Sequence, residues 1–334
     1  MRFNIKPVDE PPFIPAKESW KPQKWAVIGA SGFIGKSIVR HLNKAGIDVL
    51  KISAPRVNFK LELDPVNGIL EAIVGNPVVK QLASEIKDVD VVVNAAGAAS
   101  PDGTGEETIY GANSLLPAII AAASIEANVG RLIHLSSAAV QGRSKVIDSS
   151  TAVFPFSHYS YSKALGERAL LAFLESNPEM DISIVRATSV QGTGRPTTEK
   201  LQRLAQTPLA SVASPGSQPS VVSSVTALCE FIQLIGEYRN TRAVIQVQPW
   251  ERLNVVEVLS LSGGRKPTML PRFLCQILIN VGYLLGTFLP RITGITRRVE
   301  MMWFGQSIGS TDNQVPYEPN NSALIAILRE GLQK

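Results

Sequence analysis

Three glycines near the start of the chain constrain its fold more than any other feature. Gly29, Gly32 and Gly35 follow an apolar strand predicted at residues 25–28 and open an amphipathic helix predicted at residues 32–44. In such a unit the glycines permit a tight turn, close approach of a pyrophosphate and close helix–strand packing. The helix N-terminus adds unpaired N–H groups and a positive dipole end. A dinucleotide is therefore expected to contact Gly29, Ser31, Gly32, Phe33, Ile34 and Gly35.

Strands and helices alternate along the chain. Continuously apolar segments predict strands that are buried on both sides, which is typical of a parallel sheet covered by helices on both faces. The predicted fold class is α/β: a doubly wound parallel sheet of Rossmann type with a smaller C-terminal substrate lobe. Strands are expected at residues 25–28, 47–52, 89–93, 131–135, 182–185 and 243–247, and helices at 32–44, 113–127, 159–176, 225–235 and 255–261.

Composition divides the chain into three parts. Residues 1–23 are polar and proline-rich, so we expect an extended tail and no signal peptide. Residues 24–190 hold the dinucleotide-binding domain, and residues 191–334 form a substrate-binding lobe from which strands can return to the sheet. The first part of the lobe, residues 191–220, is rich in Gly, Pro, Ser and Thr and is expected to be a long functional loop.

Charge and cysteine content argue against other classes of protein. The chain has 334 residues, 45% of them hydrophobic, which indicates a globular protein. Its net charge of +5 is spread without a dense basic run, so nucleic acid is not an expected partner. Cys229 and Cys275 are far apart and the three histidines lack ligand spacing, so neither a disulfide framework nor a metal site is expected. Reduced thiols favour a cytoplasmic location.

The segment after the second predicted strand bears on the choice of dinucleotide. NAD-binding chains place an acidic residue about 20 positions beyond the glycines to hold the ribose 2′-hydroxyl. Residues 50–56 contain no acid, whereas Lys51, Ser53 and Arg56 can receive a 2′-phosphate. We therefore expect NADP in preference to NAD, with Arg56 as a contact. The alternative is that Lys51 and Arg56 are solvated surface charges.

A tyrosine and a lysine four residues apart begin the helix predicted at residues 159–176. Tyr159 and Lys163 share one helical face, whereas Tyr161 has no lysine four residues further on. A phenol titrates near pH 10, and a nearby ammonium is expected to lower that pKa towards neutrality, where the phenol can exchange a proton. Taken alone, the Tyr-x-x-x-Lys spacing indicates only two side chains exposed on one face of a helix.

Polar and small residues end two neighbouring strands. Ser136 and Ser137 follow the strand at residues 131–135, where the carboxyl ends of parallel strands face a ligand crevice, although one of the two is expected only to stabilise a turn. Ala95, Ala96 and Gly97 follow Asn94 and suit close passage of an adenosine. Asn113 opens the next predicted helix, where its plain role is an N-cap.

In their order and approximate spacing these motifs resemble the short-chain dehydrogenases/reductases. The Gly-Phe-Ile-Gly sequence and the chain length resemble those of the extended branch. This branch includes sugar-nucleotide epimerases, dehydratases and reductases, and relatives acting on 3β-hydroxysteroids. The resemblance is close over residues 25–192 and loose beyond. It implies that Tyr159 is the general acid/base and that Lys163 binds the nicotinamide ribose and tunes Tyr159.

The resemblance also implies further site residues. Ser137, four residues before Gln141-Gly142, would polarise the substrate oxygen, and Gln141 replaces a usual aromatic residue on the substrate side of the pocket. Asn113 would hold a proton-relay water. Val190 lies in a segment, residues 186–192, that resembles the one passing the nicotinamide.

The function implied is hydride transfer on a small-molecule substrate, with a nucleotide sugar as the first class. Sugar-nucleotide members usually carry an Arg and a Val-x-Asp in the segment that corresponds to residues 216–226, and neither is present here. Because Arg is the usual phosphate clamp, its absence weakens the case for a diphosphate-bearing substrate. A steroid-like or lipidic alcohol is the second class because of the apolar segment at residues 273–289. Arg195 is an alternative clamp, although a lone loop arginine is more often solvated. The rival function is a catalytically silent NAD(P)-binding sensor or assembly protein.

An uncharged apolar segment distinguishes the lobe. Residues 273–289 carry no charge and are bracketed by Arg272 and Arg291. A spanning helix needs about 20 apolar residues, and polar positions interrupt this segment. Residues 272–305 are therefore expected either to pack in the lobe or to contact a membrane surface, which would make the protein peripheral to the inner face of a membrane. A homodimer is also left open.

Overall fold

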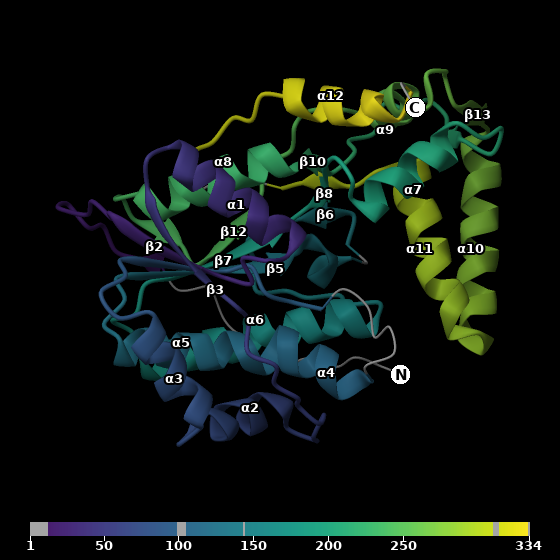
Figure 1. Ribbon diagram of the computed structural model, residues 1–334. Coiled ribbons are helices and arrows are strands. Elements are labelled where there is room, and N and C mark those ends of the chain that lie inside the picture. Colours follow the sequence, from purple (N-terminus) through teal and green to yellow (C-terminus); the bar gives the residue numbers. More distant parts are fainter. Residues whose placement is uncertain (1–12, 99–104, 143, 310–313, 333–334) are drawn as a thin grey trace.

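A six-stranded parallel sheet forms the centre of the computed structural model, which describes residues 13–98, 105–142, 144–309 and 314–332 (Figure 1). The strand order is β12-β7-β5-β4-β2-β3, and all neighbours are parallel. The order reverses at β2, which lies between β3 and β4, so the ligand crevice is expected outside the carboxyl ends of these strands. The strands are β2 (Lys24–Ile28), β3 (Asp48–Ile52), β4 (Val91–Asn94), β5 (Arg131–Ser137), β7 (Ile182–Ala187) and β12 (Ile245–Val247).

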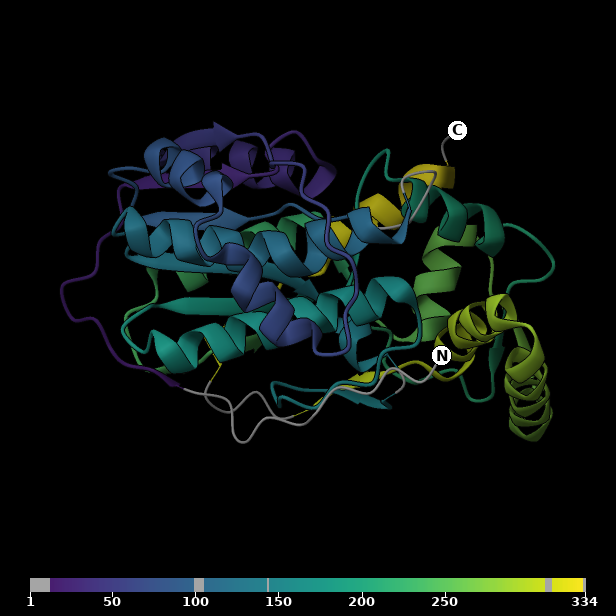
Figure 2. The same cartoon turned by 90° about the horizontal axis from the view of Figure 1, so that it is seen from below.

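Helices cover both faces of the sheet, which confirms the predicted doubly wound α/β fold (Figures 1 and 2). Alternate residues of each strand point to opposite faces; Trp25 and Val27 pack under one helical layer, whereas Ala26 and Ile28 pack under the other. The first layer holds α1 (Phe33–Lys44) and α8 (Val225–Glu237). The second holds α2 (Pro65–Ile73), α3 (Pro77–Glu85), α4 (Glu106–Tyr110), α5 (Leu116–Glu126) and α6 (His158–Ser176).

The substrate lobe is more ordered than its composition suggests. The predicted loop at residues 191–220 contains α7 (Pro196–Ala205) and β9 (Ser211–Ala213), so that prediction was wrong. The buried residues of α7 include the polar Thr198 and Gln202. Because these side chains are not apolar, the buried face of the helix does not appear as a periodic apolar pattern in the sequence. The strand expected at residues 243–247 is divided into β11 (Arg242–Ala243) and β12.

Short strand pairs tie the remaining segments together. The chain leaves the sheet after β7 and returns to it through α8 and β12. The other strands are β1 (Phe13–Ile14), β6 (Val146–Ile147), β8 (Ser189–Gln191), β10 (Val222–Ser224), β13 (Thr268–Leu270) and β14 (Ser307–Ile308). The other helices are α9 (Val255–Gly263), α10 (Arg272–Phe288), α11 (Pro290–Phe304), α12 (Ser322–Arg329) and the 3₁₀ turns Ala138–Gln141 and Glu330–Leu332.

One helical stretch of the described chain, Glu106–Glu126, is long and apolar enough to cross a membrane. It belongs to the second helical layer, and 78% of its most apolar 18-residue stretch is buried inside the molecule, as expected of a core helix. Arg272–Phe288 is also apolar but shorter.

A buried carboxylate joins the strands at the end of the sheet that lies away from the predicted crevice. Asp181, which immediately precedes β7, accepts from Arg131 Nε at 2.9 Å and from Arg242, and all three side chains are buried. Arg131 also donates to the carbonyls of Ile235 and Gly236, where α8 ends. This network therefore fixes α8 to the sheet.

Replacing Asp181 with Asn should lower the free energy of unfolding by about 3–5 kcal/mol, because two buried guanidinium groups lose their counter-charge. Urea denaturation at neutral pH measures the loss. The matched control is Glu199→Gln, which removes an exposed ion pair with Arg203 and should cost less than about 1 kcal/mol. Equal losses in the two variants would contradict the stabilising role of Asp181.

Candidate active site

The glycine turn between β2 and α1 is packed too tightly for side chains at two of its positions. Gly29 has φ +82°, and a Cβ there would lie 2.8 Å from the backbone nitrogen of Ala96. A Cβ on Gly35 would lie 2.1 Å from the Gly29 carbonyl oxygen. The turn is thus pressed against the end of β4 and the start of α1, as the sequence predicts for a phosphate-binding turn.

The N-terminus of α1 is open to a ligand. Its N-cap, Gly32, is exposed, makes no side-chain cap hydrogen bond and is followed by no acidic residue in the first turn. Ser31 is also exposed, and Phe33 and Ile34 are partly exposed. Unpaired N–H groups at a helix start bind anions well, so this end of α1 fits a pyrophosphate.

Phe33 connects the turn to the segment after β8. A Cβ on Gly192 would lie 2.4 Å from the Phe33 ring, so glycine allows the two segments to approach. The guanidinium of Arg195 lies 5.2 Å from the centre of the same ring and donates to the carbonyl of Val190, which is buried. Arg195 is therefore half-buried at the N-cap of α7, and the expectation of a solvated loop arginine was wrong.

The end of β4 passes close to the predicted catalytic helix. Asn94 accepts from the backbone nitrogen of Ala96 at 3.1 Å, and this bond shapes the chain where it leaves the strand. A Cβ on Gly97 would lie 2.8 Å from Asn113 Oδ1 and 3.0 Å from Lys163 Nζ. Gly97 thus lets the backbone lie directly against both polar side chains. The structure brings three predicted site residues together here.

Asn113 does not begin a helix, contrary to the N-cap prediction. The helix starts at Glu106, and Asn113 lies in a π-helical turn, Gly111–Leu115, between α4 and α5. Its side chain exchanges two hydrogen bonds with the backbone of Ala98, at 3.0 and 2.8 Å, and donates to Ser162 Oγ at 2.9 Å. π-Turns inside helices are frequent at functional sites. Here the turn joins the chain beyond β4 to α6.

The first turn of α6 carries the tyrosine and the lysine. A capping box between Ser157 and Ser160 fixes the start of the helix. Tyr159 is half-buried and lies close enough to Ser137, the N-cap of the 3₁₀ turn that follows β5, for this serine to affect its pKa. Lys163 is buried, and its Nζ donates to the Leu135 carbonyl at 2.9 Å. The serine, phenol and ammonium of the predicted site therefore gather at the end of β5.

The electrostatics of the pair differ from the sequence prediction. Burial raises the pKa of Tyr159 above its usual value of 10.0, while the nearby Ser137 hydroxyl and the charge of Arg195 act in the opposite direction. Burial lowers the pKa of Lys163 to about 8, against a smaller opposing effect of Glu167. The Lys163 ammonium is directed at the Leu135 carbonyl, and Arg195 supplies the cation that favours the phenolate.

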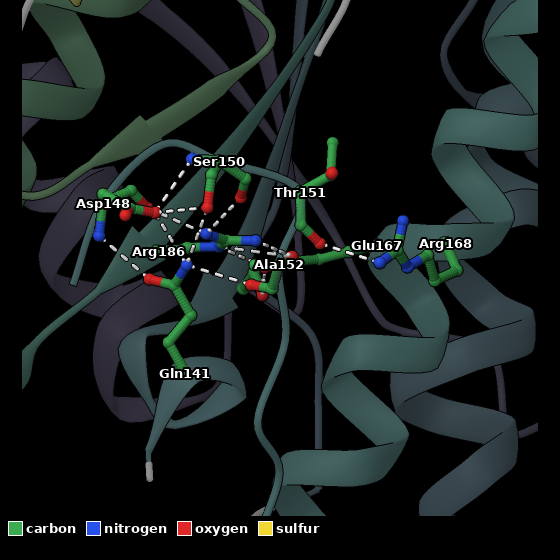
Figure 3. Close-up of polar contacts among 9 residues, drawn as sticks. Gln141, Asp148, Ser150, Thr151, Ala152, Glu167, Arg168 and Arg186 are labelled. Atoms are coloured by element: carbon green, nitrogen blue, oxygen red, sulfur yellow. Dashed lines mark hydrogen bonds and ion pairs between the residues drawn. The ribbon is translucent and has the colours of Figure 1, made fainter. Parts of the chain in front are cut away.

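Below the site, a buried ion pair links α6 to β7. Glu167, one turn beyond Lys163, pairs with Arg186 at 2.7 Å (Figure 3). It also accepts from Ser136 Oγ. Arg186 also donates to the carbonyls of Asp148 and Ser150, both at 2.8 Å. Of the two strand-end serines, Ser136 thus serves this network and Ser137 faces the phenol.

Gln141 holds the loop that leads to α6. Its side chain is buried, donates to Asp148 Oδ1 at 2.8 Å and to the Ala152 carbonyl at 2.9 Å, and accepts from the Asp148 backbone at 2.9 Å (Figure 3). These bonds direct the Gln141 amide into the loop. The effect that the sequence predicts for Gln141 on the substrate side of the pocket is therefore indirect, through the position of the loop backbone. Thr151 accepts from Arg168 in the same loop.

The residues predicted to determine the preference for NADP over NAD lie beside the glycine turn, at the end of β3. The Ile52 carbonyl at the end of β3 accepts from Gly29 N at 2.9 Å, which places the following segment beside the glycines. Lys51, Ser53 and Arg56 are exposed. The carboxyl end of β3 thus presents two cations near the turn.

An apolar cavity of about 130 Å³ lies in the lobe beyond β8 and β10. Its lining includes Leu201, Val222, Val255 and Met302. The described part of the chain holds no group of three His, Cys, Asp or Glu side chains that could bind a metal.

The fold and the order of these residues along it are of the short-chain dehydrogenase/reductase type. The model of the NAD dependent epimerase/dehydratase family matches residues 25–233. The chain belongs to this family, which confirms the resemblance to the extended branch.

Known proteins with similar sequence or structure support this assignment. The chain is 28% identical to a dTDP-6-deoxy-L-talose 4-dehydrogenase (NAD(P)(+)) of Kitasatospora kifunensis over 220 residues, which are 64% of this chain and 67% of the relative. Its fold matches a dTDP-glucose 4,6-dehydratase of Streptomyces venezuelae with NAD bound (TM-score 0.60, 18% identity, 92% and 96% of the two chains). It also matches a UDP-glucuronic acid 4-epimerase of Bacillus cereus in complex with NAD (TM-score 0.60, 17% identity, 92% and 96%).

Lys163→Met should stabilise the cofactor-free protein at pH 7 by about 1–3 kcal/mol. Because burial lowers the lysine pKa to about 8, the folded protein holds fewer protons than the unfolded chain between pH 8 and 10.5. The cost of the buried ammonium is therefore fully present below pH 8 and disappears as the pH rises towards 10.5. Urea denaturation at pH 7 and pH 10 measures the difference. Lys87→Met, at an exposed position, is the control, and a destabilised Lys163→Met at pH 7 would contradict the prediction.

Proposed function

We propose that this protein is an NAD(P)-dependent oxidoreductase that transfers a hydride to or from a carbinol or carbonyl carbon of a nucleotide sugar, with Tyr159 as general acid/base. The observation that carries the proposal is that Ser137, Tyr159 and Lys163 gather at the carboxyl end of β5, where Lys163 Nζ donates to the Leu135 carbonyl and Ser137 is near enough to Tyr159 to affect its pKa. Lys163 and the glycine turn lie on the cofactor side of Tyr159 and Ser137. A catalytically silent NAD(P)-binding sensor would not require Ser137, Tyr159 and Lys163 together.

The residues divide the chemistry between them. When bound, the dinucleotide supplies the hydride acceptor or donor. Ser137 Oγ donates to the substrate oxygen and polarises it, and the Tyr159 phenol gives its proton to that oxygen or takes one from it. Because burial raises the phenol pKa, Tyr159 is protonated at neutral pH in the free site and is set to act as an acid. Arg195 favours the phenolate, which the reverse direction requires.

Lys163 and Asn113 act on the cofactor side. Lys163 Nζ lies beside Gly97 and donates to the Leu135 carbonyl, so its remaining protons are available to ribose hydroxyls. Asn113 holds the chain beyond β4 through Ala98 and reaches α6 through Ser162. In our proposal Asn113 is therefore a positioning residue that sets the width of the cofactor crevice, in addition to the water-holding role that the family resemblance implies.

A nucleotide sugar is the proposed substrate class because the sequence relative and the structural neighbours carry the names of nucleotide-sugar enzymes. The apolar cavity in the lobe favours a second candidate, a lipidic or steroid-like alcohol, because its aliphatic lining suits a hydrocarbon group. Initial rates with a dTDP- or UDP-sugar and with a long-chain or steroid alcohol, both measured with NADP⁺, distinguish the two classes.

Tyr159→Phe should lower turnover by about 10²–10⁴-fold while leaving cofactor affinity nearly unchanged, because the ring remains and only the proton-transferring oxygen is lost. Spectrophotometric assay of the nicotinamide at 340 nm and cofactor titration measure the two quantities. Tyr161→Phe, whose ring packs against Tyr110 in the core, is the control and should retain turnover. Full activity of the Tyr159 variant would remove this residue as the acid/base.

Arg56→Gln should weaken NADPH binding by about tenfold and leave NADH binding unchanged, because a guanidinium forms strong charge-assisted hydrogen bonds to a 2′-phosphate. Fluorescence titration of both cofactors measures the ratio. Lys60→Gln, also exposed and four residues further on, is the control. An equal loss for both cofactors, or tighter binding of NADH than NADPH by the wild type, would contradict the preference for NADP.

A further inference from the structure

Helix α10 exposes a continuous apolar face. Large side chains along its whole length are between 39% and 79% exposed, with a phenylalanine near each end. Exposed apolar patches of this extent on soluble proteins mark interaction sites. The members of this face, which we call the α10 face, are Phe273, Leu274, Ile277, Leu278, Val281, Leu284, Leu285 and Phe288.

The α10 face is one side of an amphipathic arrangement and not a loosely packed core. Its residues recur at intervals of three and four, so they form one stripe along the helix. The opposite side holds Cys275, Ile279 and Gly286, which are buried against α11 and β9. Gln276 and Asn280 are hydrogen-bonded to each other at 3.1 Å and border the stripe. The helix therefore has a packed side, a polar border and an unpartnered apolar side.

The hairpin of α10 and α11 projects from the lobe. In Figure 1, α11 lies between α10 and the body of the protein, and α10 is the outermost element on that side. Figure 2 shows the same hairpin extending away from the sheet and its helices. Its tip adds Leu289 and Ile295, which are 58% and 59% exposed. The α10 face is thus accessible to a broad, flat partner.

Basic residues outnumber acidic ones around the hairpin, where Glu300 of α11 is an acid. Residues 258–299 contain six Lys or Arg and no Asp or Glu. Arg297 is paired with Glu300, whereas Arg265, Lys266 and Arg298 are exposed. Arg265 and Lys266 lie in the connection that leads through β13 into α10. An apolar helical stripe with cations beside it is the pattern that anionic lipid surfaces attract.

We propose that the α10 face docks on the surface of a bilayer that contains anionic phospholipids. The apolar side chains enter the boundary between headgroups and acyl chains, and Arg265 and Lys266 remain among the phosphates. A second copy of the chain is the weaker occupant, because residues 258–299 contain no Asp or Glu that could pair with the basic groups of the other copy. The proposal goes beyond the proposed function, and membrane partitioning requires neither cofactor nor substrate, so it can fail independently.

The test is co-sedimentation of the full chain with large unilamellar vesicles of phosphatidylcholine containing 30% phosphatidylglycerol. We expect the wild type to bind these vesicles and to bind pure phosphatidylcholine at least tenfold more weakly. Leu284→Gln/Phe288→Gln, at positions 64% and 79% exposed, should reduce the partition coefficient at least tenfold. Arg265→Gln/Lys266→Gln should reduce it about fivefold for each charge removed, and only on the anionic vesicles.

The matched control replaces two apolar residues far from the hairpin that are more exposed, at 106% and 81%. Leu63→Gln/Val74→Gln, at positions flanking α2, should partition like the wild type. Unchanged far-ultraviolet circular dichroism and thermal midpoint in all variants confirm that they fold. Absence of wild-type binding, or equal binding by Leu284→Gln/Phe288→Gln, would overturn the proposal. If the wild type does not bind vesicles but forms an oligomer that Leu284→Gln/Phe288→Gln dissociates, the α10 face belongs to an interface with a second copy.

Discussion

The buried ion pair between Glu167 and Arg186 is the interaction on which the geometry of the site depends. It joins the middle of α6 to β7, and through Ser136 it also reaches the end of β5. The remaining hydrogens of the guanidinium hold the loop that precedes α6. Since α6 carries Tyr159 and Lys163, the position of both groups relative to Ser137 follows from this contact. Removal of either partner would leave a buried charge and displace several segments together.

The parts of the site that are local in sequence could be predicted from it. The glycine turn, the Tyr-x-x-x-Lys spacing and the strand-end serines each lie within one strand–turn–helix unit, where short-range periodicity determines which side chains share a face. The starts of α2 and α3 carry equally local signals, because Asp64-Pro65 and Asn76-Pro77 each place an N-cap residue before a proline in the first turn.

The parts that depend on distant partners could not be predicted. Arg195 looks like a solvated loop residue until the fold brings Phe33 beneath it. Asn113 looks like an N-cap because neither the helical start at Glu106 nor the π-turn has a signal in residue spacing. The direction of the Tyr159 pKa shift also depends on burial, which pairwise spacing does not report.

One part of the C-terminal lobe, residues 192–221, leaves and re-enters the body of the protein at two places that lie side by side. β8, where the chain enters the lobe, is hydrogen-bonded in parallel to β10, from which α8 and β12 lead back to the sheet. Everything between them is a closed excursion that starts and ends at one fixed point. Replacement of the stretch from α7 to β9 would therefore leave the register of the six-stranded sheet unchanged and would have to preserve one other pairing, that of β9 with β13.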